Sequence, residues 1–233
     1  MCESRIKASS KPLPSATPTP HARNARVIHD LRPHDEVDTG DTDESGFDLP
    51  RIRNAVREIL LGIGEDPDRE GLLDTPRRVA KAYGELFGGI SEDPGVHLAR
   101  QFDQDGNDPV MLSDIPFTSM CEHHLLPFTG VAHVAYQPQH DRVVGLSKLA
   151  RTVQILARRP QQQERLTRQI REAIEEHLRP AACLVMVEAT HSCMQLRGVK
   201  SCGSVMRTRS AGGLWVRDAA GRREIQDIMT GSG

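Results

Sequence analysis

Two short clusters of cysteine and histidine lie far apart in this chain, and they restrict the folds that it can adopt. The first is Cys121-Glu122-His123-His124 and the second is His191-Ser192-Cys193. Cysteine and histidine from two separated clusters can converge on one divalent metal ion. Cys-x-x-His is also a common local zinc pair, because the turn between the two residues brings sulfur and nitrogen to one side. The sequence therefore predicts a fold that places the two clusters beside each other.

The residue types in these clusters predict a catalytic metal site. We assign Cys121, His124 and Cys193 as three zinc ligands with water in the fourth position, because a catalytic zinc needs an open position. Zinc lowers the pKa of its bound water from about 15.7 to about 7. His123 and His191 then remain as acid–base groups, for which an ordinary pKa of about 6.5 is suitable. A structural zinc that also uses His191, and buried thiols without a metal, stay open as alternatives.

Composition limits the classes of protein to which the chain can belong. Its 233 residues carry a formal net charge of −2, which fits one large domain or one domain with a tail. This near-neutral balance gives no whole-chain case for binding nucleic acid or a membrane surface. The sequence has no long apolar run that predicts a membrane span. Five cysteines without an export signal predict reduced thiols and a cytoplasmic location.

The first 47 residues differ in composition from the rest. The stretch from Lys11 to Pro20 is rich in proline, serine and threonine, and the stretch from Asp35 to Glu44 is acidic. Neither can bury enough apolar surface to offset the entropy lost on ordering. We therefore predict a disordered tail over 1–47 and a folded catalytic domain over 48–233.

Apolar periodicity predicts the elements of that domain. Helical spacing begins after Asp48, which can cap the first helix, and a second helix follows Asp74 and ends at Gly88. These two helices form an N-terminal part over 48–90, and a core follows over 109–230. In the core we expect helices at 146–159, capped by Ser147, and at 162–178 and 221–229. We expect strands at 110–112, 130–136, 183–189, 193–200, 203–209 and 213–217. Two helices between pairs of strands predict an α+β sandwich.

Several cations recur at helical spacing and predict a binding site for phosphate. Each of them alone is most simply a solvated surface charge. Gathered around a metal they would form a polyphosphate pocket, because Arg and Lys pair well with phosphate oxygens. Glu164, at the start of the helix over 162–178, either binds a base through hydrogen bonds or caps its own helix. The cations of this set are Arg78, Lys81, Lys148, Arg151 and Arg197.

At these residues the chain resembles the GTP cyclohydrolase I family. The resemblance covers about residues 48 to 230, and its motifs occur in the family's order and spacing. The similar segments are Thr75 to Lys81, Cys121-Glu122-His123-His124, Gly145 to Arg151, Arg159 to Thr167, Glu188 to Met194 and Arg197-Gly198-Val199.

The resemblance implies a reaction and assigns residues to it. Enzymes of this family open the imidazole ring of GTP by hydrolysis, release C8 as formate, rearrange the ribose and form 7,8-dihydroneopterin triphosphate, in the first step of pterin and folate biosynthesis. The resemblance implies that Cys121, His124 and Cys193 bind zinc and that His123 and His191 transfer protons. It also implies that a carboxylate reads the guanine edge and that cations hold the triphosphate. The substrate-binding residues that it implies are Glu164, Ser147, Lys148, Arg151, Arg197, Arg78 and Lys81.

The resemblance also implies a quaternary structure. The family has the tunnelling fold, an antiparallel sheet with helices on one face plus N-terminal helices, in which the sheets of several subunits join into a barrel. It therefore implies a homo-oligomer, typically a decamer, with active sites shared between subunits. Arg78 and Lys81 would then act in the site of a neighbouring subunit.

One segment departs from the family's pattern. Where the family usually has a strand rich in threonine and serine, this chain has Met206, Arg207 and Arg209. We expect the strand to be present with a changed pocket wall or subunit contact. This departure keeps an alternative function open, which is a divergent paralogue with another substrate or a nucleotide-binding regulatory oligomer. A relative of pyruvoyl-tetrahydropterin synthase is a third reading, against which the complete Cys-His-Cys set argues.

Overall fold

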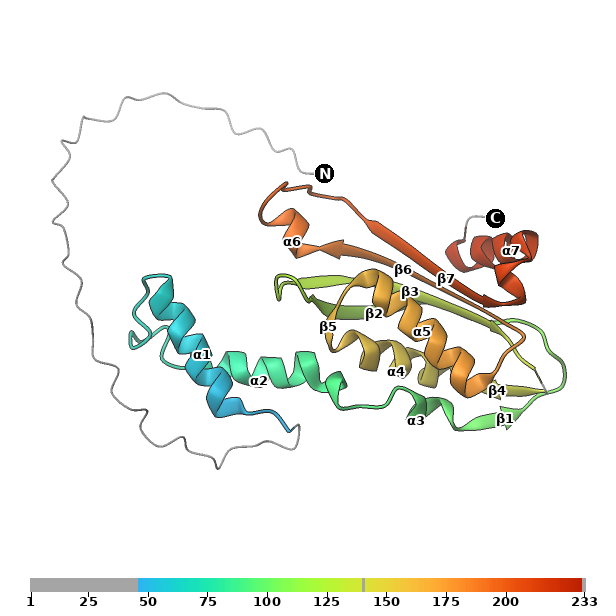
Figure 1. The fold of residues 1–233 in the computed structure, drawn as a ribbon, viewed down its shortest axis with the longest axis horizontal. Helices are drawn as coiled ribbons and strands as arrows, with labels where there is room; N and C mark the ends of the chain where they lie inside the picture. The colour runs from blue at the N-terminus through green and yellow to red at the C-terminus, as the bar shows by residue number, and fades with distance from the viewer. Residues whose placement is uncertain (1–45, 140, 232–233) are drawn as a thin grey trace, which may run out of the picture. The chain divides into compact units, whose positions relative to one another are not determined.

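The computed structural model describes residues 46–139 and 141–231 (Figure 1). The disordered tail that we predict over 1–47 lies outside these residues, apart from Gly46 and Phe47. The first two elements of the described residues are the α-helices α1 (Leu49–Gly62) and α2 (Thr75–Phe87). Asp48 accepts a hydrogen bond from the backbone N–H of Arg51 at 2.9 Å, so the predicted N-cap is confirmed. Two short helices follow, η1 (Gly88–Ile90) and α3 (Gly95–Leu98).

The core is built on a five-stranded sheet with the order β5-β2-β3-β6-β7. All neighbouring pairs are antiparallel except the short pair of β2 with β5. A separate antiparallel pair joins two three-residue strands, β1 and β4. The strand bounds are β1 (Gln101–Asp103), β2 (Val110–Cys121), β3 (Pro127–Gln137), β4 (Arg142–Val144), β5 (Pro160–Gln161), β6 (Ala182–His191) and β7 (Met206–Gly213).

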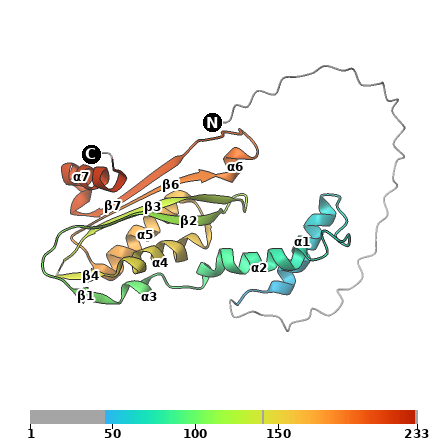
Figure 2. The same cartoon turned by 180° about the vertical axis from the view of Figure 1, so that it is seen from behind.

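Helices α4 (Leu146–Ala157) and α5 (Gln163–Leu178) pack against one face of this sheet. Their apolar sides and alternate residues of β2, β3 and β6 form the larger core, which includes Leu149, Ile170 and Val185. Helix α7 (Ala219–Thr230) lies on the opposite face, as Figures 1 and 2 show. The expected mixed fold, with helices over an antiparallel sheet, is confirmed. The helix expected at 221–229 is present as α7, but it covers the second face of the sheet, whereas we expected helices on one face only.

The structure corrects four expectations about individual elements. The segment 193–200, expected as a strand, contains the helix α6 (Ser192–Gln195) instead. Ser147 does not cap α4, because the N-cap residue is Gly145 and no side chain caps that end. The strand expected at 110–112 runs on to Cys121 through an irregularity between Leu112 and Ile115. In place of the two strands expected at 203–209 and 213–217 there is one strand, β7 (Met206–Gly213), and most of the second segment forms the 3₁₀ turn η2 (Leu214–Val216).

Candidate metal centre and active site

The first cysteine–histidine cluster forms a tight turn between β2 and β3. The Cys121 carbonyl accepts backbone hydrogen bonds from His124 at 3.3 Å and Leu125 at 2.8 Å. The Cys121 N–H donates to the carbonyl of Leu126 at 2.9 Å, which closes the turn. Leu125 takes a positive φ of 50° to complete it. The turn holds the Cys121 sulfur 3.8 Å from Nδ1 of His124.

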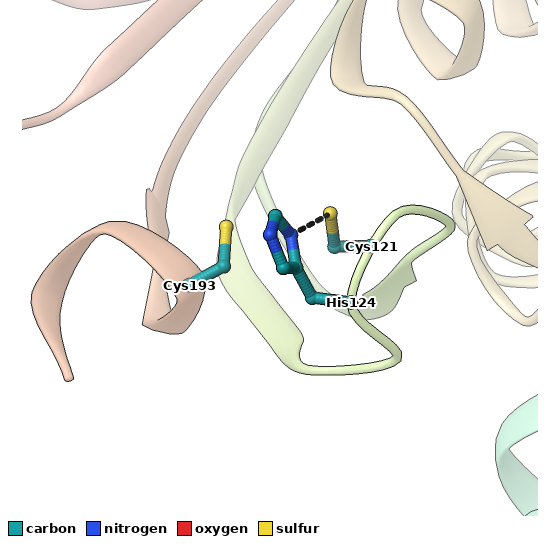
Figure 3. Close-up of side chains that lie close together, drawn as sticks. All are labelled: Cys121, His124 and Cys193. Atoms are coloured by element: carbon teal, nitrogen blue, oxygen red, sulfur yellow. Dashed lines mark hydrogen bonds between the residues drawn. The ribbon is translucent and has the colours of Figure 1, made fainter. Parts of the chain in front are cut away.

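Cys193 reaches the same place from the start of α6, directly after β6. The ligand atoms of Cys121, His124 and Cys193 all lie within 4.8 Å of one another, and Figure 3 shows the three side chains gathered together. Burial raises the pKa of the Cys193 thiol, and the neighbouring Cys121 raises it further. A divalent cation would offset both effects, because metal ligands of this type bind as thiolates. The donor set of two sulfurs and one imidazole therefore fits zinc.

The two remaining histidines of the clusters differ in their surroundings. His123 has a side chain that is 62% exposed. His191, at the end of β6, stacks on the ring of Phe128 with centroids 4.6 Å apart and planes 2° from parallel. Burial lowers the pKa of His191, against the opposing effect of Glu164. His191 is therefore a ring fixed by stacking, with its pKa lowered by burial, whereas His123 faces solvent.

A polar network connects the turn that carries Cys121 and His124 to the start of α5. Glu122 forms an ion pair with Arg165 of α5 and accepts a hydrogen bond from Gln162 Nε2 at 2.6 Å. The hydrogen bond from Arg165 holds the pKa of Glu122 below its ordinary value. Gln162 Nε2 also lies 3.3 Å from Nε2 of His123. The start of α5 is thus attached to Glu122 and His123, the two residues between the proposed ligands Cys121 and His124.

Glu164 lies in that first turn of α5 and is exposed. It does not cap the helix, since the N-cap residue is Gln162 and no side chain caps this end. Its carboxylate lines a cavity of about 550 Å³ between α5 and β7, together with Thr167 and Arg168. Glu164 is therefore free of a capping role and open to a ligand.

Helix α4 runs along the sheet from the side of β4 toward β5 (Figures 1 and 2). The chain enters α4 after Val144, whose N–H donates to the Tyr136 hydroxyl at 3.0 Å. It leaves α4 toward Pro160, which pairs with Met120, the residue before Cys121. Tyr136 and Met120 lie at the two ends of the β2–β3 pair. A helix of 12 residues is about 18 Å long, so the start of α4 is far from the metal group.

This arrangement limits the part of the expected polyphosphate pocket that one chain can form. Ser147, Lys148 and Arg151 all lie in the first turns of α4, so one chain does not bring them to the metal group. Arg197 does lie there, with Nη1 3.4 Å from Nε2 of His124. A single chain therefore supplies only part of the expected cationic set.

The two cations of α2 are exposed side chains on a surface helix. Arg78 is 74% exposed and pairs with Asp74 of its own helix at 3.3 Å. Lys81 lies three residues further on, so both lie on one side of α2. Their expected role as triphosphate ligands of a neighbouring subunit stays a prediction.

Comparison with known proteins agrees with this geometry. The family model described as GTP cyclohydrolase I matches residues 52–230. The chain belongs to the GTP cyclohydrolase I family. A relative named GTP cyclohydrolase 1 from Bacillus cytotoxicus is 56% identical over 181 residues, which cover 78% of this chain and 96% of that protein. One of the same name from Rhodopirellula baltica is 50% identical over 210 residues, covering 90% and 87%.

A solved structure gives a weaker similarity. The archaeosine synthase QueF-Like in the apo form matches with a TM-score of 0.39 and 16% identity, covering 47% of this chain and 97% of that chain. Membership of the GTP cyclohydrolase I family rests on the sequence comparisons alone. Among the described residues, no helix combines the length and apolar character that crossing a membrane requires.

The structure clarifies the segment that departs from the GTP cyclohydrolase I pattern. Arg207 pairs with Glu188 at 3.1 Å, and Arg209 Nη1 donates to Gln226 of α7 at 2.9 Å. Both lie on the α7 face of the sheet, because side chains alternate along a strand. Thr208, between them, lies on the α5 face and contacts Thr167 at 2.6 Å. The two arginine side chains therefore bond on the α7 face, although Arg209 also borders the cavity that Glu164 lines.

Sequence reasoning gave no role to four residues that surround the proposed histidines and the turn. Three of them lie within the family motif from Arg159 to Thr167, and their place in that motif could have indicated a role at the site. Phe128 had no signal, because only the β3–β6 register places it opposite His191. The four are Gln162, Gln163, Arg165 and Phe128.

Proposed function

We propose that this protein catalyses the hydrolytic ring opening of GTP, with release of C8 as formate and formation of 7,8-dihydroneopterin triphosphate. The observation that supports it most is the convergence of Cys121, His124 and Cys193 within 4.8 Å in a chain of the GTP cyclohydrolase I family. The reaction would belong to the start of pterin and folate biosynthesis. It needs GTP and reduced thiols, which agrees with the cytoplasmic location expected from the cysteines.

The metal centre would activate water for the hydrolysis. Cys121, His124 and Cys193 would hold a zinc ion, which supplies a Lewis acid and lowers the pKa of water near the purine C8. Metal binding by two thiols and an imidazole releases protons. The support for zinc over harder cations is the sulfur content of the group.

The protein groups around the centre would recognise the base and move protons. His191, held against Phe128, is suited to accept or donate a proton as the C8–N bonds break. His123, exposed beside the metal group, is suited to exchange protons with solvent. Glu164 would accept hydrogen bonds from the N1–H and 2-amino groups of guanine. Adenine cannot supply these donors and would leave the carboxylate unpaired, which favours GTP over ATP.

The triphosphate would be held by more than one subunit. Arg197 lies at the metal group of its own chain, whereas Lys148 and Arg151 lie at the other end of α4. A second copy of the chain that presents the start of its α4 to this metal group would complete the cationic set. We therefore propose a homo-oligomer with shared sites, which the family's decameric barrel would provide, and with Arg78 and Lys81 contributed across a subunit boundary.

A direct assay tests the reaction. The zinc-loaded protein is incubated with GTP, and formate and the absorbance of dihydroneopterin triphosphate are followed, with ATP as the control substrate. Formate from GTP and none from ATP is the expected result. Binding of GTP without any formate would overturn the proposal and favour the nucleotide-binding regulatory oligomer instead.

Subunit complementation tests the shared site. Lys148→Ala and Cys193→Ala remove groups from the two proposed halves, so each variant alone is expected to be inactive. Oligomers assembled from both chains should recover activity, because some sites then combine an intact α4 with an intact metal group. Mixed oligomers as inactive as their parents would show that each chain carries a complete site.

A further inference from the structure

Gln163 is a buried polar residue next to the proposed chemistry, and its side chain is only 1% exposed. It lies in the first turn of α5, beneath the end of β6. Its carboxamide nitrogen donates to the carbonyls of Val187 and Met206, both at 3.0 Å. Its carboxamide oxygen lies 2.9 Å from Nε2 of His191. Every polar atom of this side chain therefore has a partner, as burial requires.

The partners of Gln163 fix the orientation of its carboxamide. Carbonyl oxygens only accept hydrogen bonds, so the group that faces Val187 and Met206 has to be the NH₂. The oxygen is left to face His191. A reversed carboxamide would place an oxygen against two carbonyls in a buried site, which is unfavourable.

The hydrogen bonds of two threonines independently indicate the same orientation of the Gln163 carboxamide. The Thr167 hydroxyl donates to the carbonyl of Gln163 at 2.8 Å, so it has no proton left for Thr208. The Thr208 hydroxyl, 2.6 Å away, therefore donates to Thr167. The lone pairs of Thr208 are then available to the carboxamide NH₂ of Gln163, which lies 3.2 Å away. The direction of each hydrogen bond in this circuit agrees with the NH₂ facing β7.

The orientation of Gln163 determines where His191 carries its proton. A carboxamide oxygen cannot donate, so Nε2 of His191 has to be the protonated nitrogen in the neutral ring. Nδ1 is then the nitrogen available to a reacting group. The bond to Gln163 also persists when the ring is doubly protonated, because Nε2 keeps its proton in both states.

We propose that Gln163 is a positioning residue that holds His191 in the Nε2-protonated tautomer and leaves Nδ1 for proton transfer with the substrate. This inference rests on the proposed function for the identity of the reaction. It also gives β7 a part in the site, since Met206 and Thr208 hold the carboxamide that holds His191.

The location of the proton can be measured without an assay of activity. The full-length protein is labelled with [¹⁵N]histidine, and ¹⁵N NMR distinguishes protonated from bare ring nitrogens. A His191→Asn variant assigns the signal by removing it. We expect Nε2 of His191 to be protonated in the wild-type protein. A proton on Nδ1 with Nε2 bare would overturn the proposal without any need for a Gln163 variant.

Three variants then test the role of Gln163. Gln163→Met keeps the length of the side chain and removes the acceptor, so both tautomers of His191 should appear. We expect kcat to fall about 10- to 100-fold with KM changed by less than about threefold, as for other residues that orient a catalytic imidazole. Gln163→Glu keeps an oxygen toward His191 and, with its other oxygen protonated so that it donates to Val187 or Met206, should keep Nε2 protonated. Gln101→Met is the matched control, because Gln101 Nε2 also donates to a backbone carbonyl, that of His177 at 3.0 Å, at the opposite end of α5 from Gln163.

The outcomes separate positioning from simple loss of stability. Gln101→Met should lower the melting temperature through the loss of its hydrogen bond to His177, with the His191 signal unchanged. Equal losses of kcat in the two methionine variants, or an unchanged tautomer in Gln163→Met, would refute the positioning role. If Gln163→Met does not fold, a bare Nε2 in Gln163→Glu refutes it equally. If the wild-type protein releases no formate from GTP, the proposed function fails, while the NMR results still decide where the proton lies.

Discussion

Arg165 of α5 forms an ion pair with Glu122, the residue that follows the metal-group cysteine Cys121. Arg165 is held in turn by the carbonyl of Pro160 at 2.9 Å and by Gln161 Oε1 at 3.0 Å. A helix of the main core therefore sets the position of the turn that carries two of the three proposed metal ligands. Residues that orient metal ligands, as Arg165 does here, usually affect metal affinity strongly without touching the metal.

We expect Arg165→Met to weaken zinc binding about 10- to 100-fold, because the turn at Cys121 loses its attachment to α5. Competition with a chelator of known affinity measures this change. The matched control is Arg168→Met, one turn along the same helix, whose partner is Glu172 at 3.6 Å. Equal zinc affinity in both variants would contradict the role given to Arg165.

Removal of a metal ligand should remove the metal. Cys193→Ala leaves only two donors, so we expect zinc bound per chain to fall close to zero after dialysis, together with formate release. Cys202→Ala is the control, because Cys202 is exposed and lies outside the metal group. Elemental analysis of both variants checks this prediction, and full zinc content in Cys193→Ala would contradict the assignment.

The centre of the sheet should not tolerate a side chain at Gly130. A Cβ atom there would collide with the backbone carbonyl of Glu188 on β6, and a backbone atom cannot move aside cheaply. We expect Gly130→Ala to lower the free energy of unfolding by about 1–3 kcal/mol. Gly62→Ala is the control, since nothing lies within 4 Å of its Cβ position. Urea unfolding measures both variants, and equal stabilities would contradict the close approach of β3 and β6.

The cysteines should differ sharply in their reactivity toward thiol reagents. Cys183 is fully buried, and burial raises its pKa far above the ordinary value, so little thiolate forms in the folded state. Cys202 is exposed. We expect Cys202 to be labelled rapidly and Cys183 only after unfolding, as mass mapping of labelled peptides would show. Early labelling of Cys183 in folded protein would contradict its place in the core.

Tyr136 should make the protein less stable in alkali. Burial raises the pKa of its hydroxyl, whereas an exposed tyrosine ionises near pH 10, at about its ordinary pKa. Above that pH the unfolded chain loses a proton that the folded chain keeps, so the free energy of unfolding falls as pH rises. Tyr136→Phe should lose about 1–3 kcal/mol near neutral pH, because the N–H of Val144 is left unpaired. In urea titrations, the free energy of unfolding of Tyr136→Phe should then fall less steeply than that of the wild type as the pH passes the ordinary tyrosine pKa of about 10. An identical pH dependence in both proteins would contradict this account.

The five long helices, α1, α2, α4, α5 and α7, could be read from the sequence because each has one apolar face and clear ends. The strands were harder to predict. In β2 the alternation of buried residues changes phase where Asp114 takes a positive φ of 56°, so only its first residues showed a simple pattern. The segment after His191 was predicted as a strand, but it turns immediately into α6, and no local feature of Ser192 or Cys193 distinguishes the two conformations.

The composition of the metal group could be predicted, because Cys-x-x-His and a distant cysteine are chemically distinctive. The location of Lys148 and Arg151 could not be, since it depends on the direction in which α4 crosses the sheet. Gln163 also escaped prediction, because a glutamine next to Glu164 at a helix start has no chemistry of its own. Its importance comes from the register that brings Val187 and Met206 to the same point.

The alternation of β7 bears on how such a chain can diverge. Thr208 and Ser210 face α5, where they bond to Gln163 and to Arg171. Arg207 and Arg209 face the other way and bond to Glu188 and Gln226. One strand thus presents two surfaces that are constrained separately. Relatives can accumulate substitutions at every second position of this strand and still keep the hydrogen bonds that reach the histidine.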